Sequence, residues 1–244
     1  MKLPRIIGHR GAAEDAPENT LESFRAAARE GATWVEFDAK LSADNAIVIL
    51  HDDDLDRTTS GRGPARLRTL AELQALDAGA WFKPAFAGAR IPTLAETVAV
   101  LDQLGLGANV EIKPCPGREK ETASVVMAAL RRLWPKARPL PLVSSFAPEC
   151  LRVAQAEAPE FSRGLLLEEH PLDWLAQARG VGAATVNIWE RDATPDWCRE
   201  IKAAGYGLLA YTVNDADRAA QLFAWGVDGV FTDAPGRLLA KLGN

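Results

Sequence analysis

The chain has 244 residues, of which 48% are hydrophobic and 25% charged, a composition typical of a globular protein and not of a disordered or fibrous one. The formal net charge is −5 at pH 7, and no dense run of lysine or arginine is present, which argues against nucleic acid or stable membrane association. Three scattered cysteines argue against a disulfide framework and against a cysteine-based zinc site. No stretch resembles a signal peptide or a membrane span, so the sequence predicts a cytoplasmic protein.

Short apolar runs alternate with helical segments along almost the whole chain. The runs predicted as strands lie at 6–7, 34–35, 47–50, 110–112, 142–143, 164–167, 184–188, 208–213 and 227–231. The segments with helical periodicity lie at 21–30, 94–104, 119–134, 148–157, 196–204 and 216–225. This alternation predicts a parallel sheet. With so many units and no linker, we expect residues 1–244 to form a single TIM (β/α)8 barrel, with a doubly wound open sheet as the alternative.

The sequence predicts one strand more than a (β/α)8 barrel uses. Two predicted strands near the N-terminal end of the chain explain the extra strand. The run that contains Glu36 and the run that ends at His51 are separated only by a short turn near Asp44. Parallel neighbours need a crossover of about a dozen residues, so this pair is predicted to be an antiparallel hairpin. A turn near Asp44 places His51 opposite Phe37, between Glu36 and Asp38, whose side chains share one face of the strand.

Residues 53–92 interrupt the alternation of strand and helix. An acidic stretch is followed by a basic, glycine-rich piece and then by Trp81, Phe82 and Lys83. We expect an inserted subdomain that lies over one end of the barrel, because insertions of this length in compact domains are usually functional.

Three acids fall at or near the ends of predicted strands, namely Glu36, Asp38 and Glu111. Carboxylates are poorly tolerated inside strands, and three that converge would repel one another unless a cation joined them. Their hard oxygen ligands suit Mg²⁺ or Ca²⁺. The alternative is that each acid pairs with an arginine or lysine at the barrel rim.

The chain has only three histidines, and two of them, His9 and His51, fall beside these acids. Two imidazoles that titrate near neutrality can supply the general acid and general base of a phosphoryl transfer. Arg10 and Lys113 add fixed cations of the kind that neutralise a phosphodiester. His170 lies outside this group and is predicted to be a loop or helix-start residue.

Taken together, these motifs resemble those of the glycerophosphodiester phosphodiesterase family, in particular its short bacterial members. The matching segments span nearly the whole chain: 9–11, 17–21, 36–38, 51–52, 91–94, 111–113, 144–146, 211–214 and 226–233. The resemblance implies a TIM barrel, a divalent metal and hydrolysis of deacylated phospholipids to glycerol 3-phosphate and an alcohol. Tyr211 stands where some members have tryptophan.

Residue by residue, the resemblance implies a catalytic acid–base pair, a set of metal ligands and a set of substrate-binding residues. The pair is His9 and His51. The ligands are Glu36, Asp38 and Glu111. The substrate-binding residues are Arg10 and Lys113, which would bind the phosphate, with Glu18 and Asn19. Asn19 would orient groups of the active site, or Asn19 or Thr20 would cap the helix that begins at Leu21.

Two routes of attack stay open at this point: attack by a hydroxyl of the substrate, which gives a cyclic phosphate, or attack by water. Which histidine is the acid stays equally open, as do the head group of the substrate and the oligomeric state. Two alternative functions are a lysophospholipase D-like phosphodiesterase on the same barrel and a barrel that binds glycerophosphodiesters without cleaving them. Trp81, Phe82 and Phe86 are the only sequence features that favour an acyl-chain groove.

Overall fold

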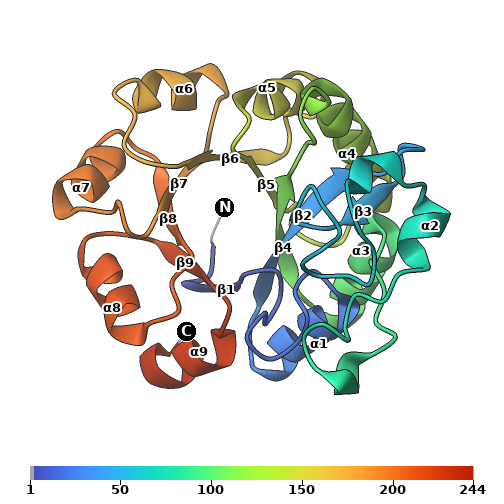
Figure 1. Ribbon diagram of the computed structural model, residues 1–244. Coiled ribbons are helices and arrows are strands. Elements are labelled where there is room, and N and C mark those ends of the chain that lie inside the picture. The colour runs from blue at the N-terminus through green and yellow to red at the C-terminus, as the bar shows by residue number, and fades with distance from the viewer. Residues whose placement is uncertain (1–2, 244) are drawn as a thin grey trace.

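The computed structural model describes residues 3–243. Within that range, eight parallel strands close into a barrel, and a further strand, β3, bonds antiparallel outside it (Figure 1). The strands are β1 (Ile6–Gly8), β2 (Trp34–Leu41), β3 (Ile47–Ile49), β4 (Gly107–Ile112), β5 (Leu142–Ser145), β6 (Ser162–Leu167), β7 (Thr185–Trp189), β8 (Gly207–Tyr211) and β9 (Gly229–Thr232). Because β1 pairs with both β9 and β2, the ring of eight parallel strands is closed, which confirms the TIM barrel over the open sheet.

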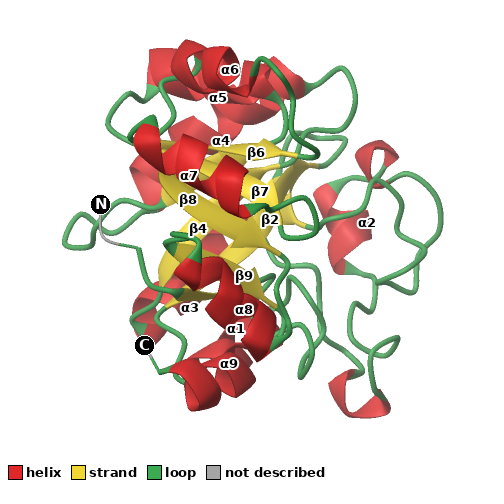
Figure 2. Ribbon diagram, turned by 90° about the vertical axis from the view of Figure 1, so that its left-hand side faces the viewer, coloured by secondary structure: helices red, strands yellow, loops and turns green. Residues whose placement is uncertain are grey.

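The helices form a ring around this barrel, except for α2, which lies at one end of it (Figures 1 and 2). They are α1 (Leu21–Arg29), α2 (Leu70–Gln74), α3 (Leu94–Leu104), α4 (Glu119–Leu133), α5 (Pro148–Glu157), α6 (Trp174–Gly180), α7 (Pro195–Ala203), α8 (Ala216–Ala224) and α9 (Pro235–Leu242). All six segments with predicted helical periodicity are helical. No helix was predicted from the sequence at α2, α6 or α9, which are five, seven and eight residues long. The helices α2 and α6 hold too few turns to show a periodic apolar face. The helix α9 does have an apolar face, and its pattern was missed.

Local signals set the ends of the helices that flank the functional residues. The Thr20 side chain accepts a hydrogen bond from the backbone N–H of Ser23 and thereby caps α1. At α3, Thr93 and Glu96 form a reciprocal capping box, and Gly105 ends the helix in the left-handed region at φ 74°. These caps fix where α1 and α3 begin and where the chain turns from α3 towards β4.

The hairpin of β2 and β3 has the predicted register. Ala39 pairs with Ile49 and Leu41 with Ile47, so continuing the same register places His51 opposite Phe37. Beyond the end of β3, the backbone N–H of Leu50 still donates to the Asp38 carbonyl over 3.0 Å. The hairpin therefore returns His51 to the strand that carries Glu36 and Asp38.

The side chains of β2 alternate between two environments. Glu36 and Asp38 point into the barrel, whereas Phe37 packs outward, with its ring centroid 5.8 Å from that of Phe24 on α1. Both phenylalanine side chains are fully buried. This packing holds the strand against its helix layer and thereby positions the two acids.

Replacing Phe37 with alanine is expected to lower the free energy of unfolding by about 3–5 kcal/mol, because a buried aromatic ring is lost and leaves a cavity. The exposed Leu172 offers a matched control. The change Leu172→Ala is expected to alter stability by less than about 0.5 kcal/mol. Urea unfolding followed by circular dichroism measures both, and equal stabilities of the two variants would contradict this account of the packing.

Residues 53–92 contain α2 and two short 3₁₀ helices, η1 (Ala65–Leu67) and η2 (Pro84–Phe86). In Figure 2 the α2 region lies at one end of the barrel. A small apolar cluster ties this segment to β3 and includes the buried residues Val48, Leu50, Leu55, Ala65, Leu73, Ala78 and Ile91. No helix within residues 3–243 is long and apolar enough to cross a membrane.

Candidate active site

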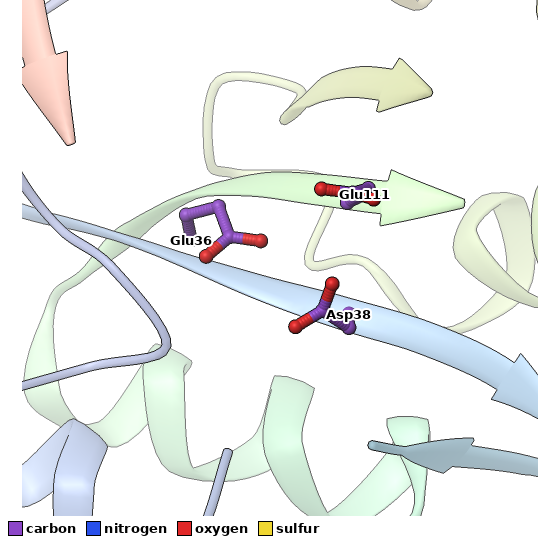
Figure 3. A group of neighbouring side chains, drawn as sticks. All are labelled: Glu36, Asp38 and Glu111. Atoms are coloured by element: carbon purple, nitrogen blue, oxygen red, sulfur yellow. The ribbon is translucent and has the colours of Figure 1, made fainter. Parts of the chain in front are cut away.

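Three carboxylates converge inside the barrel. Glu36 and Asp38 lie two residues apart on β2, and Glu111 on β4 pairs in register with Asp38. One ligand oxygen from each residue lies within 4.8 Å of those of the other two, and all three residues are buried (Figure 3). The register of two neighbouring parallel strands therefore assembles the predicted acidic group.

The three acids have different pKa values because their surroundings differ. Burial, and then the charges of Asp38 and Glu111, raise the pKa of Glu36 well above its usual range. Burial and the charge of Asp38 also raise the pKa of Glu111 to about 7. Burial opposes ionisation of Asp38 as well, but Arg10, followed by His51 and Lys113, outweighs it and holds the pKa of Asp38 at about 2. Asp38 is therefore the permanent negative charge of the group.

The group has the properties of a cation site. Glu36 Oε1 and Asp38 Oδ1 are buried and have no hydrogen-bond partner among the residues that the structure describes. Unpaired buried carboxylate oxygens are costly, and a hard divalent cation would satisfy them. The donor set, three carboxylates without sulfur or imidazole, fits Mg²⁺ or Ca²⁺.

Cation binding at this group is expected to release protons and to strengthen as the pH rises. Glu111 and Glu36 must lose their protons to act as ligands, and the pKa of Glu111 is about 7. The affinity for Mg²⁺ or Ca²⁺ is therefore expected to increase about tenfold or more between pH 6 and pH 8. Calorimetric titration in two buffers that differ in ionisation enthalpy measures the affinity for the cation and the number of protons released. Equal affinities at pH 6 and pH 8, without proton release, would refute this expectation.

His9 directly follows β1, and its two ring nitrogens have different surroundings. Nδ1 lies 2.7 Å from Asp233 Oδ1, and Asn214 Nδ2 donates to the other oxygen of that carboxylate over 2.7 Å. Nε2 faces the acidic group, 4.0 Å from Glu36 Oε2. The carboxylate of Asp233 therefore fixes the ring and directs Nε2 towards the acids.

The two ring nitrogens of His51 also have different partners, and a carboxylate again contacts Nδ1. Its Nδ1 lies 2.7 Å from Asp52 Oδ1, and its Nε2 lies 2.8 Å from Lys113 Nζ. Burial lowers the pKa of His51, whereas the charges of Glu111 and Asp38 outweigh burial and raise that of Lys113. The lysine ammonium therefore donates to Nε2, and the protonated Nδ1 donates to Asp52.

Arg10 links the loop after β1 to the acids. It occupies the left-handed region at φ 52°, where its backbone N–H donates to Glu36 Oε2 over 2.9 Å. Its guanidinium donates to Glu18 Oε1 over 2.7 Å and lies 3.5 Å from Asp38 Oδ2. Asn19 Nδ2 donates to the same Asp38 oxygen over 2.8 Å. Thr20, and not Asn19, provides the side-chain cap of α1.

These groups surround a cavity of about 250 Å³ at the carboxyl ends of the barrel strands. Its lining combines ionisable, amide and hydroxyl side chains with a small apolar wall: His9, Arg10, Glu36, His51, Asn109, Glu111, Lys113, Phe146, Leu166, Glu168, Tyr211, Thr212 and Phe231. Glu18 and Asn19 do not line the cavity; they contact Arg10 and Asp38, respectively. The carboxyl end of the strands is where TIM barrels place their active sites, so the fold and the cavity define a TIM-barrel enzyme.

Comparison with known proteins identifies the family of this enzyme. A model of the glycerophosphoryl diester phosphodiesterase family matches residues 9–237. A glycerophosphodiester phosphodiesterase of Caldanaerobacter subterraneus subsp. tengcongensis is 32% identical over 238 residues, which cover 96% of each chain. A glycerophosphodiester phosphodiesterase of Bacillus subtilis is 32% identical over 253 residues, which cover 94% of this chain and 83% of that protein.

Among solved structures, a phosphodiesterase of Oleispira antarctica in complex with the product sn-glycerol-3-phosphate matches with a TM-score of 0.96 at 40% identity. The match covers 99% of this chain and 98% of that one. The chain therefore belongs to the glycerophosphoryl diester phosphodiesterase family and is an enzyme of that family, which confirms the family resemblance of its motifs.

No functional role was predicted from the sequence for Asp52, Asp233 or Arg57. Asp52 and Asp233 fall within segments that resemble the family, and this was the only available signal for them. Their contacts with the two imidazoles are contacts between side chains, which no strand or helix periodicity encodes.

Proposed function

We propose that this enzyme hydrolyses small glycerophosphodiesters to sn-glycerol 3-phosphate and an alcohol, with a divalent cation as cofactor. The observation that carries the proposal is the convergence of three carboxylates, two imidazoles and two fixed cations on one cavity of about 250 Å³. The bound product of the Oleispira antarctica relative supports the nature of the substrate.

Arg10 and Lys113 would bind the phosphate. Both line the cavity, and each already neutralises part of the acidic group, so their positive charges are held in place before substrate arrives. Fixed charges aimed at the non-bridging oxygens favour the transition state because little reorganisation is needed when charge develops there.

His9 and His51 would move the two protons of the reaction at their Nε2 atoms. Each Nδ1 is occupied by a carboxylate, Asp233 or Asp52, which sets the ring orientation and the tautomer. One imidazole would take the proton of the attacking group, either a substrate hydroxyl or water, while the other protonates the leaving alcohol oxygen. If the hydroxyl attacks, the product of this step is a cyclic phosphate, which water then opens to glycerol 3-phosphate.

Glu36, Asp38 and Glu111 would hold Mg²⁺ or Ca²⁺. When bound, the cation would neutralise charge on a phosphoryl oxygen and lower the pKa of a nearby hydroxyl. Asn19, which bonds to Asp38, and Glu18, which bonds to Arg10, were expected to bind substrate. We propose that both act on the substrate through these two partners.

We further propose that residues 1–244 form one phosphodiesterase domain in which 53–92 is an inserted subdomain. The apolar cluster that joins this segment to β3 supports the division, since it is separate from the clusters between the barrel and its helices. The segment begins directly after His51 and Asp52, so its packing bears on their positions.

A lysophospholipase D-like activity would need a groove for an acyl chain. Phe82 packs edge-to-face on both Trp81 and Phe86, and none of the three residues lines the cavity. Turnover of glycerophosphocholine and lysophosphatidylcholine, compared at equal concentration, distinguishes the two functions. The proposal predicts glycerol 3-phosphate from the first substrate and slower cleavage of the second; faster release of lysophosphatidate would overturn it. Tight binding of glycerophosphocholine without cleavage would favour a binding protein.

A further inference from the structure

Arg57 lies in residues 53–92 and joins two carboxylates that belong to different parts of the site. Its Nη1 and Nη2 donate to the two oxygens of Glu18 over 2.6 and 2.8 Å. Its Nε and Nη2 donate to the two oxygens of Asp52 over 2.7 and 2.9 Å. One planar guanidinium therefore makes two bidentate contacts, a geometry that lysine is unable to reproduce.

Both carboxylates also hold a residue that lines the cavity. Glu18 Oε1 accepts from Arg10 Nη1 over 2.7 Å, and Asp52 Oδ1 lies 2.7 Å from His51 Nδ1. Arg57 itself is not among the residues of the cavity wall. An unbroken series of charged contacts therefore runs from Arg10 through Glu18, Arg57 and Asp52 to His51.

The turn that carries Arg57 is anchored on both sides. Leu55 is 1% exposed within the apolar cluster, and Thr58 and Thr59 are both 5% exposed. Thr59 Oγ1 donates to the Leu55 carbonyl over 2.6 Å and accepts from the Gly61 N–H over 2.9 Å. The backbone at Arg57 is thereby fixed, so the guanidinium is presented to both carboxylates from a rigid base.

We propose that Arg57 is a positioning residue that orients His51 through Asp52 and Arg10 through Glu18. This inference rests on the proposed function of those two residues. It also gives residues 53–92 a specific task, which is to hold one imidazole and one phosphate-binding cation in a fixed relation across the cavity.

The first test is kinetic and uses glycerophosphocholine with the chain of residues 1–244. Arg57→Ala is expected to lower kcat and kcat/KM together by about 10–100-fold, the usual effect of misplacing a catalytic group by about 1 Å. Arg57→Lys keeps the positive charge but lacks the planar, bidentate guanidinium, so it is expected to stay folded without recovering kcat. Added guanidinium ion is expected to restore part of the turnover of Arg57→Ala.

Arg62→Ala serves as the matched control. Arg62 lies in the same segment, its side chain is 73% exposed, and it pairs with Asp56 over 3.6 Å. The control is expected to turn over at the wild-type rate. Equal rates for Arg57→Ala and Arg62→Ala, in an active wild-type background, would overturn the inference. So would full recovery of kcat in Arg57→Lys.

A double variant tests whether Arg57 acts on His51 through Asp52. If Arg57 acts on turnover through Asp52, Asp52→Asn with Arg57→Ala is expected to be little slower than the slower single variant. Fully multiplicative losses would show that Arg57 acts independently of Asp52 and would overturn the proposed route.

The second readout does not depend on activity. The chain has three histidines, so their ring ¹⁵N resonances can be assigned with alanine variants. Arg57→Ala is expected to shift the His51 signals and to leave those of His170 unchanged; unchanged His51 signals would overturn the inference. An inactive wild-type protein that shows the His51 shift would refute the proposed function and leave the positioning contact established.

Discussion

Replacing His9 or His51 with alanine is expected to lower kcat for glycerophosphocholine by about 10²–10⁴-fold, the contribution typical of a positioned acid or base. Each imidazole lines the cavity and directs Nε2 inward, with Nδ1 held by a carboxylate. The fold is expected to remain, since both side chains face the cavity and not the apolar core. Steady-state kinetics and circular dichroism measure the two effects.

His170 provides the matched control. It stacks on Trp197 with ring centroids 4.3 Å apart and does not line the cavity. His170→Ala is expected to keep wild-type turnover. Near wild-type activity in either His9→Ala or His51→Ala would refute the acid–base assignment.

Replacing Asp38 with asparagine is expected to abolish cation binding and turnover together. Asp38 is the acid of the group whose pKa lies lowest, at about 2, and its buried Oδ1 has no hydrogen-bond partner within residues 3–243. Loss of an outer-sphere partner typically lowers metal affinity 10–100-fold, so loss of a direct ligand charge is expected to cost more than about 100-fold. Calorimetric titration with Mg²⁺ and Ca²⁺ measures the affinity, and glycerol 3-phosphate release measures turnover.

Asp196→Asn, on the exposed surface of α7, controls for the loss of one negative charge. It is expected to bind the cation and turn over like the wild type. If Asp38→Asn bound cations with wild-type affinity, the three carboxylates would not be the metal ligands. If it lost affinity but kept turnover, the reaction would not need the cation at this position.

The hairpin shows how much of the site could be predicted from sequence. Its short turn near Asp44 leaves no room for a parallel crossover, so pairing and register follow from local rules. The observed pair of Ala39 and Ile49 has the predicted register, which returns His51 towards Glu36 and Asp38. Strand alternation then places both acids inside the barrel.

The contacts that support the imidazoles could not be predicted in this way. Asp233 lies 224 positions from His9 in the sequence, and their contact depends on the closure of β9 onto β1 and on two side-chain rotamers. Arg57 reaches Glu18 across 39 positions, from a segment with no periodic pattern. Periodicity identifies strands and faces, whereas such contacts depend on the path of individual loops.

The proposed function requires the three buried carboxylates to hold a cation that is needed to cleave a glycerophosphodiester. The most direct test is release of glycerol 3-phosphate from glycerophosphocholine by chelator-stripped protein, with and without added Mg²⁺ or Ca²⁺. We expect negligible release from the stripped protein and restored release when a divalent ion is added. Folded protein that releases no glycerol 3-phosphate with either ion, or that releases it equally well without any, would contradict the claim.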